Sequence, residues 1–341
     1  MSTASVLVIE VGGTTLRAAR FDPLAAHLGP VRTRSTPAPD ALADAADAND
    51  HLAGVLAVAA ELAAEVLGGD PPDAVGVGFP GPVGPDGRVL ASPTILRHGG
   101  AAPFDLVSAC AATWPGARLL CVNDLTAAGL AHVSDGLRDF VIITIGSGIG
   151  HKVFLDGRVR VGFGRGGEIG HLRLDLSPNA PRCDCGGVGH LGGLASGRGT
   201  VAMVRRHAQL DPAAYRASVL SSRGPHDLEE LDGAAVAMAF ISGDDFVRSA
   251  VAVSQEYLGQ ALAALHLDTG VEDIIITGGF AFGMGEDYVM GIAAAGGRCS
   301  WALGQDWARM VRLDPHGEGV ALLGLGRALT ESPGSGAVPR R

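Results

Sequence analysis

Cysteine, aromatic residues and long hydrophobic runs are all scarce in this chain of 341 residues, which has 5 cysteines and is 5% aromatic. Five cysteines cannot build a disulfide framework in a chain of this length, and they indicate a reducing compartment. No apolar run approaches the roughly 18 residues of a membrane span, and no basic run flanks an apolar segment at the N-terminus. We therefore expect a soluble, cytoplasmic protein without a signal peptide.

Basic residues are also in the minority, since 26 lysines and arginines stand against 36 aspartates and glutamates, a formal net charge of −10. Such a surface cannot neutralise phosphates, which excludes nonspecific nucleic-acid binding. Hydrophobic residues make up 47% of the chain and charged residues 18%, which is far too apolar for intrinsic disorder. Length and composition together predict two folded domains.

Short β-rich runs followed by glycines recur along the chain. VLVIEV (6–11) precedes GGTT and LRAARF (16–21), and FVIITI (140–145) precedes GSGIG and HKVFLDGRV. Both patterns predict a strand, a glycine turn and a second strand. The duplication predicts two domains of related architecture facing each other across a cleft, although chance repetition of a common hairpin explains it equally well.

Helical patterns lie between these strands. Segments 40–68 and 246–267 are rich in Ala and Leu, and EDIIITGG (272–279) returns to a strand and a glycine turn. LLCV before Asn123 is typical of a strand and LTAAGLAHV after Asp124 is typical of a helix, so Asp124 is expected to cap that helix. The alternation of strands and helices predicts an α/β architecture.

Three glycine turns follow hydrophobic strands, and their backbone N–H groups can approach phosphate oxygens because no Cβ intervenes. They contain Gly12, Gly13, Gly146, Gly148, Gly278 and Gly279, with hydroxyl donors from Thr14, Thr15 and Ser147. We expect a nucleoside polyphosphate to bind them, although each can also be a plain tight turn. The G-x-G-x-G spacing over 146–150 is not that of a nicotinamide-binding Rossmann fold, and a P-loop motif is absent from the sequence.

Carboxylates accompany two of the predicted strands. Asp124 follows one strand, at the edge where α/β sheets bind ligands, and can accept the proton of an attacking hydroxyl in phosphoryl transfer. A plain helix cap is the alternative role for Asp124. Glu10 precedes the first glycine turn and can hold Mg²⁺ directly or through water, or can face solvent from its strand.

Two histidines and two cysteines form the sharpest group of candidate ligands, namely His171, Cys183, Cys185 and His190. These four side chains can complete a tetrahedral zinc site, which would be structural because four protein ligands leave no open position. The C-x-C spacing is tighter than in most zinc fingers, and a histidine can equally be a hydrogen-bonded core residue.

In their order over residues 6 to about 330, these motifs resemble the ROK family of sugar kinases, a branch of the hexokinase/actin-like fold. The matching segments are EVGGT (10–14), GFPGPV (78–83), ND (123–124), GSGIG (146–150), GEIGH (167–171), CDCGGVGH (183–190) and GG (278–279). The resemblance implies two ribonuclease H-like α/β domains with a cleft that closes over ATP·Mg²⁺ and a sugar, and it implies a homodimer. We expect a small domain over 1–122, a large domain over 123–314, a helix near 315–330 that returns to the small domain, and a disordered tail over 331–341.

The resemblance also implies roles for individual residues. By the matching positions, Asp124 is the general base, while Asn123, Glu168, His171 and Gly81 bind the acceptor. His171 is in addition a zinc ligand of the family.

The sequence departs from the family pattern mainly on the acceptor side. Gly192 stands where the family has a glutamate that holds a sugar hydroxyl, and the P-N-L segment is Pro93-Thr94-Ile95 here. Glu10 replaces an aspartate, and His190 replaces the third zinc cysteine. Because a site built on hydrogen bonds discriminates sharply, the acceptor need not be glucose. We expect a hexose-like polyol, phosphorylated on its exocyclic primary hydroxyl, with an amino sugar or a C7 cyclitol as alternatives.

Two other classes of function remain as alternatives. One is a sugar-responsive repressor, which would carry a helix-turn-helix extension before the first strand, whereas that strand begins at Val6 and the net charge does not suit DNA. The other is a sugar- or nucleotide-binding protein without turnover. The sequence leaves open whether ATP or polyphosphate is the donor and whether the chain forms dimers or tetramers.

Overall fold

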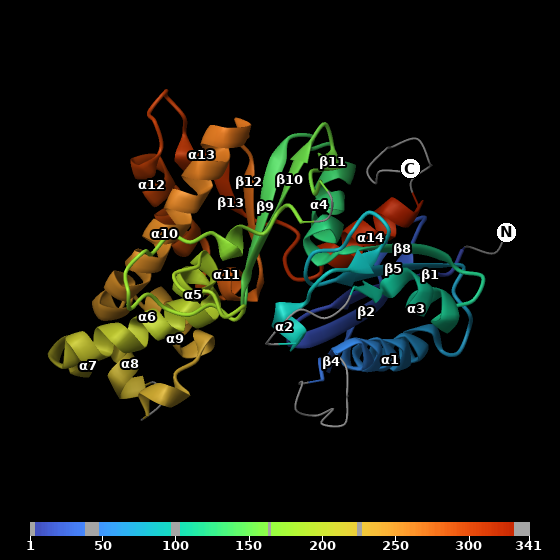
Figure 1. Cartoon of the computed structure of the whole chain (residues 1–341), viewed down its shortest axis with the longest axis horizontal. Helices are drawn as coiled ribbons and strands as arrows, with labels where there is room; N and C mark the ends of the chain where they lie inside the picture. Colours follow the sequence, from blue (N-terminus) through green and yellow to red (C-terminus); the bar gives the residue numbers. More distant parts are fainter. Residues whose placement is uncertain (1–3, 38–47, 97–102, 163–164, 224–226, 331–341) are drawn as a thin grey trace. The chain divides into compact units, whose positions relative to one another are not determined.

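The computed structural model describes residues 4–37, 48–96, 103–162, 165–223 and 227–330 (Figure 1). The chain divides into two compact units. The first unit comprises Met1–Asp139, Lys152–Gly167 and Gly319–Arg341, and the second comprises Phe140–His151 and Glu168–Glu318. Among the described residues, no helix combines the length and the hydrophobicity that a membrane span needs.

The first unit is built on a mixed sheet with the strand order β3-β2-β1-β5-β8, and β4 also pairs with β2. Its strands are β1 (Val6–Val11), β2 (Thr15–Asp22), β3 (His27–Leu28), β4 (Arg32–Ser35), β5 (Ala74–Phe79) and β8 (Arg118–Asn123). β1 and β2 form the predicted antiparallel hairpin, while β5 and β8 continue the sheet in parallel. Parallel pairing places Phe79 opposite Asn123, so both strands end at the same edge.

Helices cover both faces of this sheet. α1 (Ala48–Leu67) and α3 (Leu106–Thr113) enclose the main apolar core together with Leu7, Ile9 and the alternate residues of β5. On the other face α14 (Val320–Thr330) packs against α4 (Asp124–Ser134) and against β1 and β5. The shorter elements are α2 (Pro93–Leu96) and the two-stranded pair of β6 (Arg88–Val89) and β7 (Phe104–Asp105).

The second unit contains the parallel strands β9 (Phe140–Ile145), β12 (Ile274–Thr277) and β13 (Val311–Leu313). They belong to a five-stranded sheet of order β11-β10-β9-β12-β13, in which β10 is Ile149–Leu155 and β11 is Arg158–Val159. The boundary between the two units runs through β10, between His151 and Lys152.

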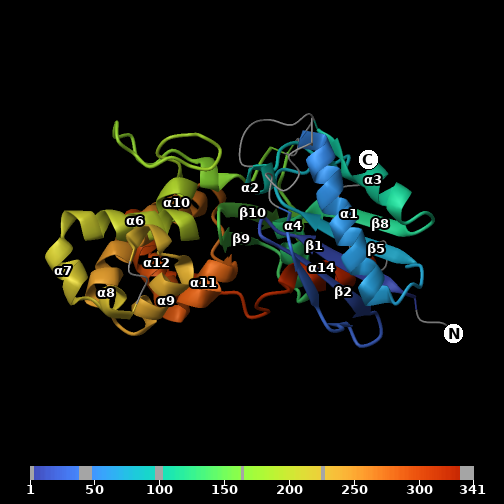
Figure 2. The same ribbon diagram turned by 90° about the horizontal axis from the view of Figure 1, so that it is seen from below.

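Helices make up most of the second unit, and α6 to α9 gather at one end of it (Figure 2). The elements are η2 (Ile169–His171), α5 (Leu191–Ala195), α6 (Gly197–Leu210), α7 (Pro212–Ala217), α8 (Val219–Arg223), η3 (Leu228–Glu230), α9 (Gly233–Ile241), α10 (Asp245–Thr269), α11 (Gly279–Met284), α12 (Glu286–Cys299) and α13 (Trp307–Met310). α10 is the central helix, since it packs against α12, α6, α5 and α9.

Three expectations differ from the structure or lie beyond it. The sequence places 123–314 in the large domain, but 123–139 and 152–167 fall in the first unit; α4 belongs to it because it packs on α14 and β5. The helix expected over 40–68 is described only as α1, since 38–47 lies outside the described residues. The tail 331–341 also lies outside the described residues.

Candidate functional site

The junction between β8 and α4 presents the predicted base. The helix cap is Asn123 and not Asp124, because Asn123 Oδ1 accepts the N–H groups of Leu125 at 3.0 Å and Thr126 at 3.1 Å. Asp124 is the first helical residue, and its Oδ1 accepts from Asn123 Nδ2 and Leu125 N, each at 2.8 Å. Two N–H donors therefore orient the half-buried carboxylate at the end of the strand.

Gly81 completes this junction through its backbone. Its carbonyl accepts the second Asn123 Nδ2 hydrogen bond at 2.9 Å. The residue has a φ of +97°, and a Cβ on it would lie 2.0 Å from Ala91 O, so only glycine fits. Asn123, with 7% exposure, thus links a glycine turn, the helix N-terminus and the Asp124 carboxylate.

The first glycine turn, Gly12–Thr15, is closed by the Gly12 N–H, which donates to Thr15 O at 3.0 Å. Thr36 braces the turn, since its hydroxyl donates to Gly12 O at 2.7 Å and its N–H donates to Thr14 O at 3.0 Å. Sequence reasoning missed Thr36, because it lies more than 20 residues along the chain and reaches the turn only because β4, which it follows, pairs with β2.

Glu10 lies opposite Arg17 in the β1–β2 register, and its Oε2 is 3.5 Å from Arg17 Nη1. Both side chains are about four-fifths buried, with exposures of 20% and 24%. A carboxylate is the ligand type that Mg²⁺ prefers, but here a guanidinium already neutralises one oxygen. Glu10 fits Mg²⁺ only through its other oxygen or through water.

The other two glycine turns lie at one edge of the second unit's sheet. β9 and β12 pair in parallel with Thr144 opposite Thr277, so the turns that follow them, 146–148 and 278–279, emerge side by side. Gly146 N donates to Gly148 O at 3.0 Å, and Gly146 O accepts from Gly197 N at 2.8 Å. The N-terminus of α6 therefore supports the second turn, and Gly279 begins α11.

Arg198 connects the second glycine turn to the cysteine loop. Its Nε donates to Ser147 O at 3.0 Å, and its Nη2 lies 2.5 Å from a carboxylate oxygen of Asp184. Asp184 lies between Cys183 and Cys185, so one side chain bridges two predicted sites of the unit. Arg198 was not predicted from the sequence, because the motif directly before it, Ala195-Ser196-Gly197, contains only small residues.

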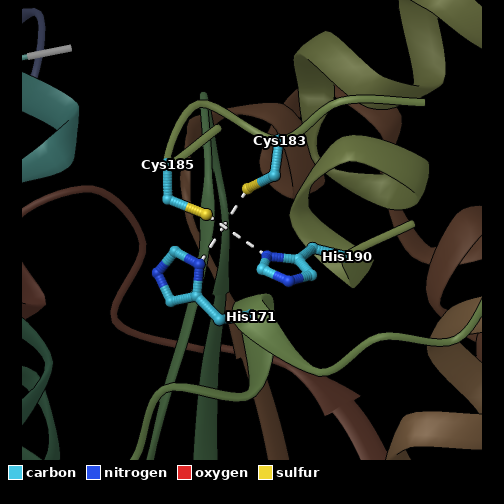
Figure 3. A group of neighbouring side chains, drawn as sticks. All are labelled: His171, Cys183, Cys185 and His190. Carbon is cyan, nitrogen blue, oxygen red and sulfur yellow. Dashed lines mark hydrogen bonds between the residues drawn. The ribbon is translucent and has the colours of Figure 1, made fainter. Parts of the chain in front are cut away.

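The four predicted zinc ligands come together (Figure 3). Their ligand atoms all lie within 4.8 Å of one another; Cys185 Sγ is 3.2 Å from His190 Nδ1, and Cys183 Sγ is 4.0 Å from His171 Nδ1. A tetrahedral zinc with ordinary bond lengths spaces its ligand atoms by about 3.3–3.8 Å. The donor set fits zinc after small shifts, with Cys183 and His171 moving closer together and Cys185 and His190 moving slightly apart.

Burial shifts the pKa values of two of these ligands in opposite directions. It lowers the pKa of His190, with help from His171 and Arg173, and so keeps the imidazole neutral, which is its ligating form. Burial raises the pKa of the Cys183 thiol, so a metal ion would have to displace its proton on binding.

Glu168 and His171 belong to one tight turn. Glu168 precedes the 3-10 turn η2, and its carbonyl accepts the His171 N–H at 3.0 Å. Glu168 and His171 lie in the second unit, whereas Asn123, Asp124 and Gly81 lie in the first. The predicted acceptor-binding residues thus divide between the units: Asn123 and Gly81 accompany Asp124 in the first, and Glu168 and His171 accompany the other predicted zinc ligands in the second.

Gly192 leaves little room for a side chain. A Cβ on Gly192 would lie 3.2 Å from Cys183 Sγ and 3.2 Å from Gly170 O, closer than ordinary van der Waals contact. A side chain here would therefore require Cys183 Sγ or the Gly170 carbonyl to shift by a few tenths of an ångström.

Comparisons with known proteins agree on one family and one fold. The family model described as "ROK family" matches residues 6–291. The chain is 34% identical to a C(7)-cyclitol 7-kinase of Streptomyces hygroscopicus, covering 85% of this chain and 83% of the relative. It is 32% identical to a 2-epi-5-epi-valiolone 7-kinase of an Actinoplanes species, covering 83% and 79%.

Among solved structures, a ROK family glucokinase from Streptomyces griseus in complex with glucose and AMPPNP superposes with a TM-score of 0.76. It is 23% identical, and the match covers 95% of this chain and 99% of that one. This likeness confirms the predicted hexokinase-like fold.

Proposed function

Because the chain belongs to the ROK family, and its relatives confirm the expectation of a kinase, we propose that it transfers the terminal phosphoryl group of ATP to the exocyclic primary hydroxyl of a C7 cyclitol. The observation that carries the proposal is the β8–α4 junction, which holds the Asp124 carboxylate by two N–H donors at the end of a parallel strand. A fixed carboxylate at that position suits proton removal from an alcohol as it attacks phosphorus.

Each group of residues has a part in this mechanism. Asp124 takes the proton of the attacking hydroxyl, and Asn123 holds Asp124 in place. Both N–H donors and both lone pairs of the Asn123 amide are used within the junction, so its expected contact with the acceptor would require one of these bonds to be exchanged. The glycine turns at 12–15, 146–148 and 278–279 offer N–H groups to the phosphates. Mg²⁺, when bound, would neutralise charge on the β- and γ-phosphate oxygens, and Glu10 is the residue that we assign to it.

Glu168 and His171 are proposed to hydrogen-bond hydroxyl groups of the acceptor. His171, Cys183, Cys185 and His190 are proposed to hold a structural zinc ion, since their ligand atoms already converge. The zinc ion would fix the loop and orient His171. It has no part in the transfer step, because four protein ligands leave no position for substrate.

Two observations favour a cyclitol over glucose as the acceptor. Two relatives that cover most of the chain are named as kinases of C7 cyclitols, and Gly192 lacks the carboxylate side chain that the resemblance places at this position to hold a sugar hydroxyl. An amino sugar is the second candidate, because another relative, at 30% identity, is an N-acetylmannosamine kinase of Salmonella. We further propose that the chain acts in the cytoplasm as a homodimer, which sedimentation velocity would distinguish from a monomer or a tetramer.

An acceptor panel tests the proposal. ADP release is measured with glucose, N-acetylmannosamine and C7 cyclitols such as 2-epi-5-epi-valiolone, first with ATP and then with polyphosphate as donor. We expect kcat/KM for a C7 cyclitol to exceed that for glucose at least about 100-fold, the discrimination that lost or gained hydrogen bonds produce. Nucleotide binding by calorimetry without turnover on any acceptor would instead support a binding protein.

A further inference from the structure

Two consecutive polar side chains are buried in β10. His151 is 7% exposed and Lys152 is 2% exposed, whereas the rest of this strand is glycine or apolar. A buried ammonium is costly unless it is well hydrogen-bonded. Both side chains hydrogen-bond to the segment that carries Glu168.

Lys152 holds the chain just before Glu168. Its Nζ donates to the carbonyl oxygens of Gly166 and Gly167, each at 3.3 Å. Gly167 has a φ of +87°, which orients its carbonyl in a way that few other residues allow. One buried charge therefore fixes two consecutive peptide groups on the N-terminal side of Glu168.

His151 holds the chain just after Glu168. Its Nδ1 accepts the N–H of Ile169, the first residue of η2, at 3.1 Å, so the ring is neutral with its proton on Nε2. The first N–H groups of a helical turn need an outside partner. Glu168 occupies the cap position but makes no side-chain capping bond. The imidazole caps this turn in place of the carboxylate.

We propose that His151 and Lys152 are positioning residues of the acceptor site, which fix the backbone on both sides of Glu168 so that its carboxylate is directed to an acceptor hydroxyl and not to its own turn. The same turn carries His171, whose backbone N–H donates to Glu168 O at 3.0 Å. This inference rests on the proposed function, because it assigns Glu168 to the acceptor.

Matched substitutions at His151 provide the first test. His151→Asn keeps an acceptor atom, Oδ1, at the same number of bonds from the backbone, and His151→Leu removes it. We expect His151→Leu to raise the KM for the cyclitol about 10-fold, as the loss of one hydrogen bond implies, and to leave the KM for ATP within about twofold. His151→Asn is expected to restore the acceptor KM to within about threefold of wild type.

Lys152→Met tests the other contact, because it keeps most of the length of the side chain and removes the ammonium. The same selective increase in acceptor KM is expected. A fall in melting temperature with both KM values unchanged would show that Lys152 only stabilises the fold. Equal increases in the KM for ATP and in the KM for the cyclitol, in either His151→Leu or Lys152→Met, would overturn the positioning role.

Amide hydrogen exchange at Ile169 tests the capping contact without any activity. We expect exchange at least about 10-fold faster in His151→Leu than in wild type, and near-wild-type exchange in His151→Asn. Unchanged exchange in His151→Leu would overturn this proposal alone. Absence of turnover by the wild-type chain on the whole acceptor panel would overturn the proposed function, whatever the exchange shows.

Discussion

The β8–α4 junction and the segment Gly166–His190 fix their functional side chains by different means. At the junction, a paired strand runs directly into a capped helix, and the side-chain amide of Asn123 and the backbone N–H of Leu125 orient Asp124. The segment Gly166–His190, all of which is described, has only the 3-10 turn η2 and isolated bridges as regular structure. Scattered backbone hydrogen bonds hold this segment, and its geometry depends in addition on side chains: His151, Lys152 and the four predicted zinc ligands.

This difference predicts how a substitution in each region changes activity and stability. A substitution at the junction should remove chemistry and leave the fold intact, because the surrounding backbone bonds remain. A substitution in the segment should loosen the loop and weaken binding together, because the same side chains do both. Kinetics and melting temperatures, measured on the same variants, separate the two responses.

The largest effect is expected for Asp124→Asn. The new Oδ1 can accept the same two N–H groups, so the junction should keep its shape while the base is lost. We expect kcat to fall by about 10²–10⁴-fold, with the KM values for ATP and acceptor within about threefold and an unchanged melting temperature. Steady-state kinetics and thermal unfolding measure these quantities.

Asp135→Asn is the matched control for the junction. Asp135 caps the other end of α4 and pairs with Arg327 at 2.7 Å in an exposed position. Its loss should leave kcat within about twofold, since exposed ion pairs contribute only about 0–1 kcal/mol to stability. An Asp124→Asn enzyme that kept a tenth of wild-type kcat would rule out Asp124 as the general base.

Loss of the proposed zinc ion is expected to have the next largest effect, and a different one. Cys183→Ser and Cys185→Ser should each lower the zinc content from about one ion per chain towards zero. A site filled at 100 times its Kd stabilises the fold by about 2.7 kcal/mol, so melting should fall by about 5–10 °C. The KM for the acceptor should rise with it, because His171 belongs to both sites.

Cys299→Ser is the control, because Cys299 is an exposed free cysteine at the end of α12. Its zinc content and melting temperature should match those of the wild type. Metal analysis of protein purified without chelator measures the number of zinc ions per chain. Less than about half an ion per wild-type chain would contradict the four-ligand site.

A smaller effect is expected for Gly192→Ala, which adds one methyl group against Cys183 Sγ and Gly170 O. Mild overpacking of this kind costs about 1 kcal/mol, or about fivefold in zinc affinity measured by competition with a chromogenic chelator. Gly283→Ala in α11 is the matched control, since its Cβ would lie 3.9 Å from Ala237, an ordinary contact. Equal zinc affinity in the two variants would show that the loop has room at Gly192.

The helices and strands were predictable because the spacing of hydrophobic residues along the sequence indicates them. The alternation in VLVIEV and LRAARF predicts the hairpin that β1 and β2 form, and the Ala/Leu pattern over 246–267 predicts α10, observed as Asp245–Thr269. The exact cap of α4 was not predictable. Asn123 and Asp124 both suit a cap, and only the β5–β8 register, which keeps Asn123 in the strand, decides between them.

The candidate site was predictable where a short motif carries it. The spacing of Cys183, Cys185 and His190 brings three predicted ligands into one loop, and the structure places the fourth predicted ligand, His171, beside them. His151 and Lys152 were missed, because polar residues in a strand pattern indicate a solvent-facing side. Their burial depends on carbonyl and amide groups 14 to 18 residues away, which no local pattern contains.

The smallest effect is expected for Glu10→Gln, which tests whether the first unit's glycine turn also binds metal through a side chain. The carboxylate is already paired with Arg17 at 3.5 Å, so it can supply Mg²⁺ with one oxygen at most. We expect the Mg²⁺ concentration for half-maximal rate to rise about threefold and kcat at saturating Mg²⁺ to stay within about twofold, because the phosphates provide most of the metal's ligands.

Arg17→Met is the matched control: it removes the competing cation and should lower that Mg²⁺ concentration. If Glu10→Gln left the Mg²⁺ dependence unchanged, Glu10 would be a structural partner of Arg17, and the metal would depend on the nucleotide and on other residues of the chain.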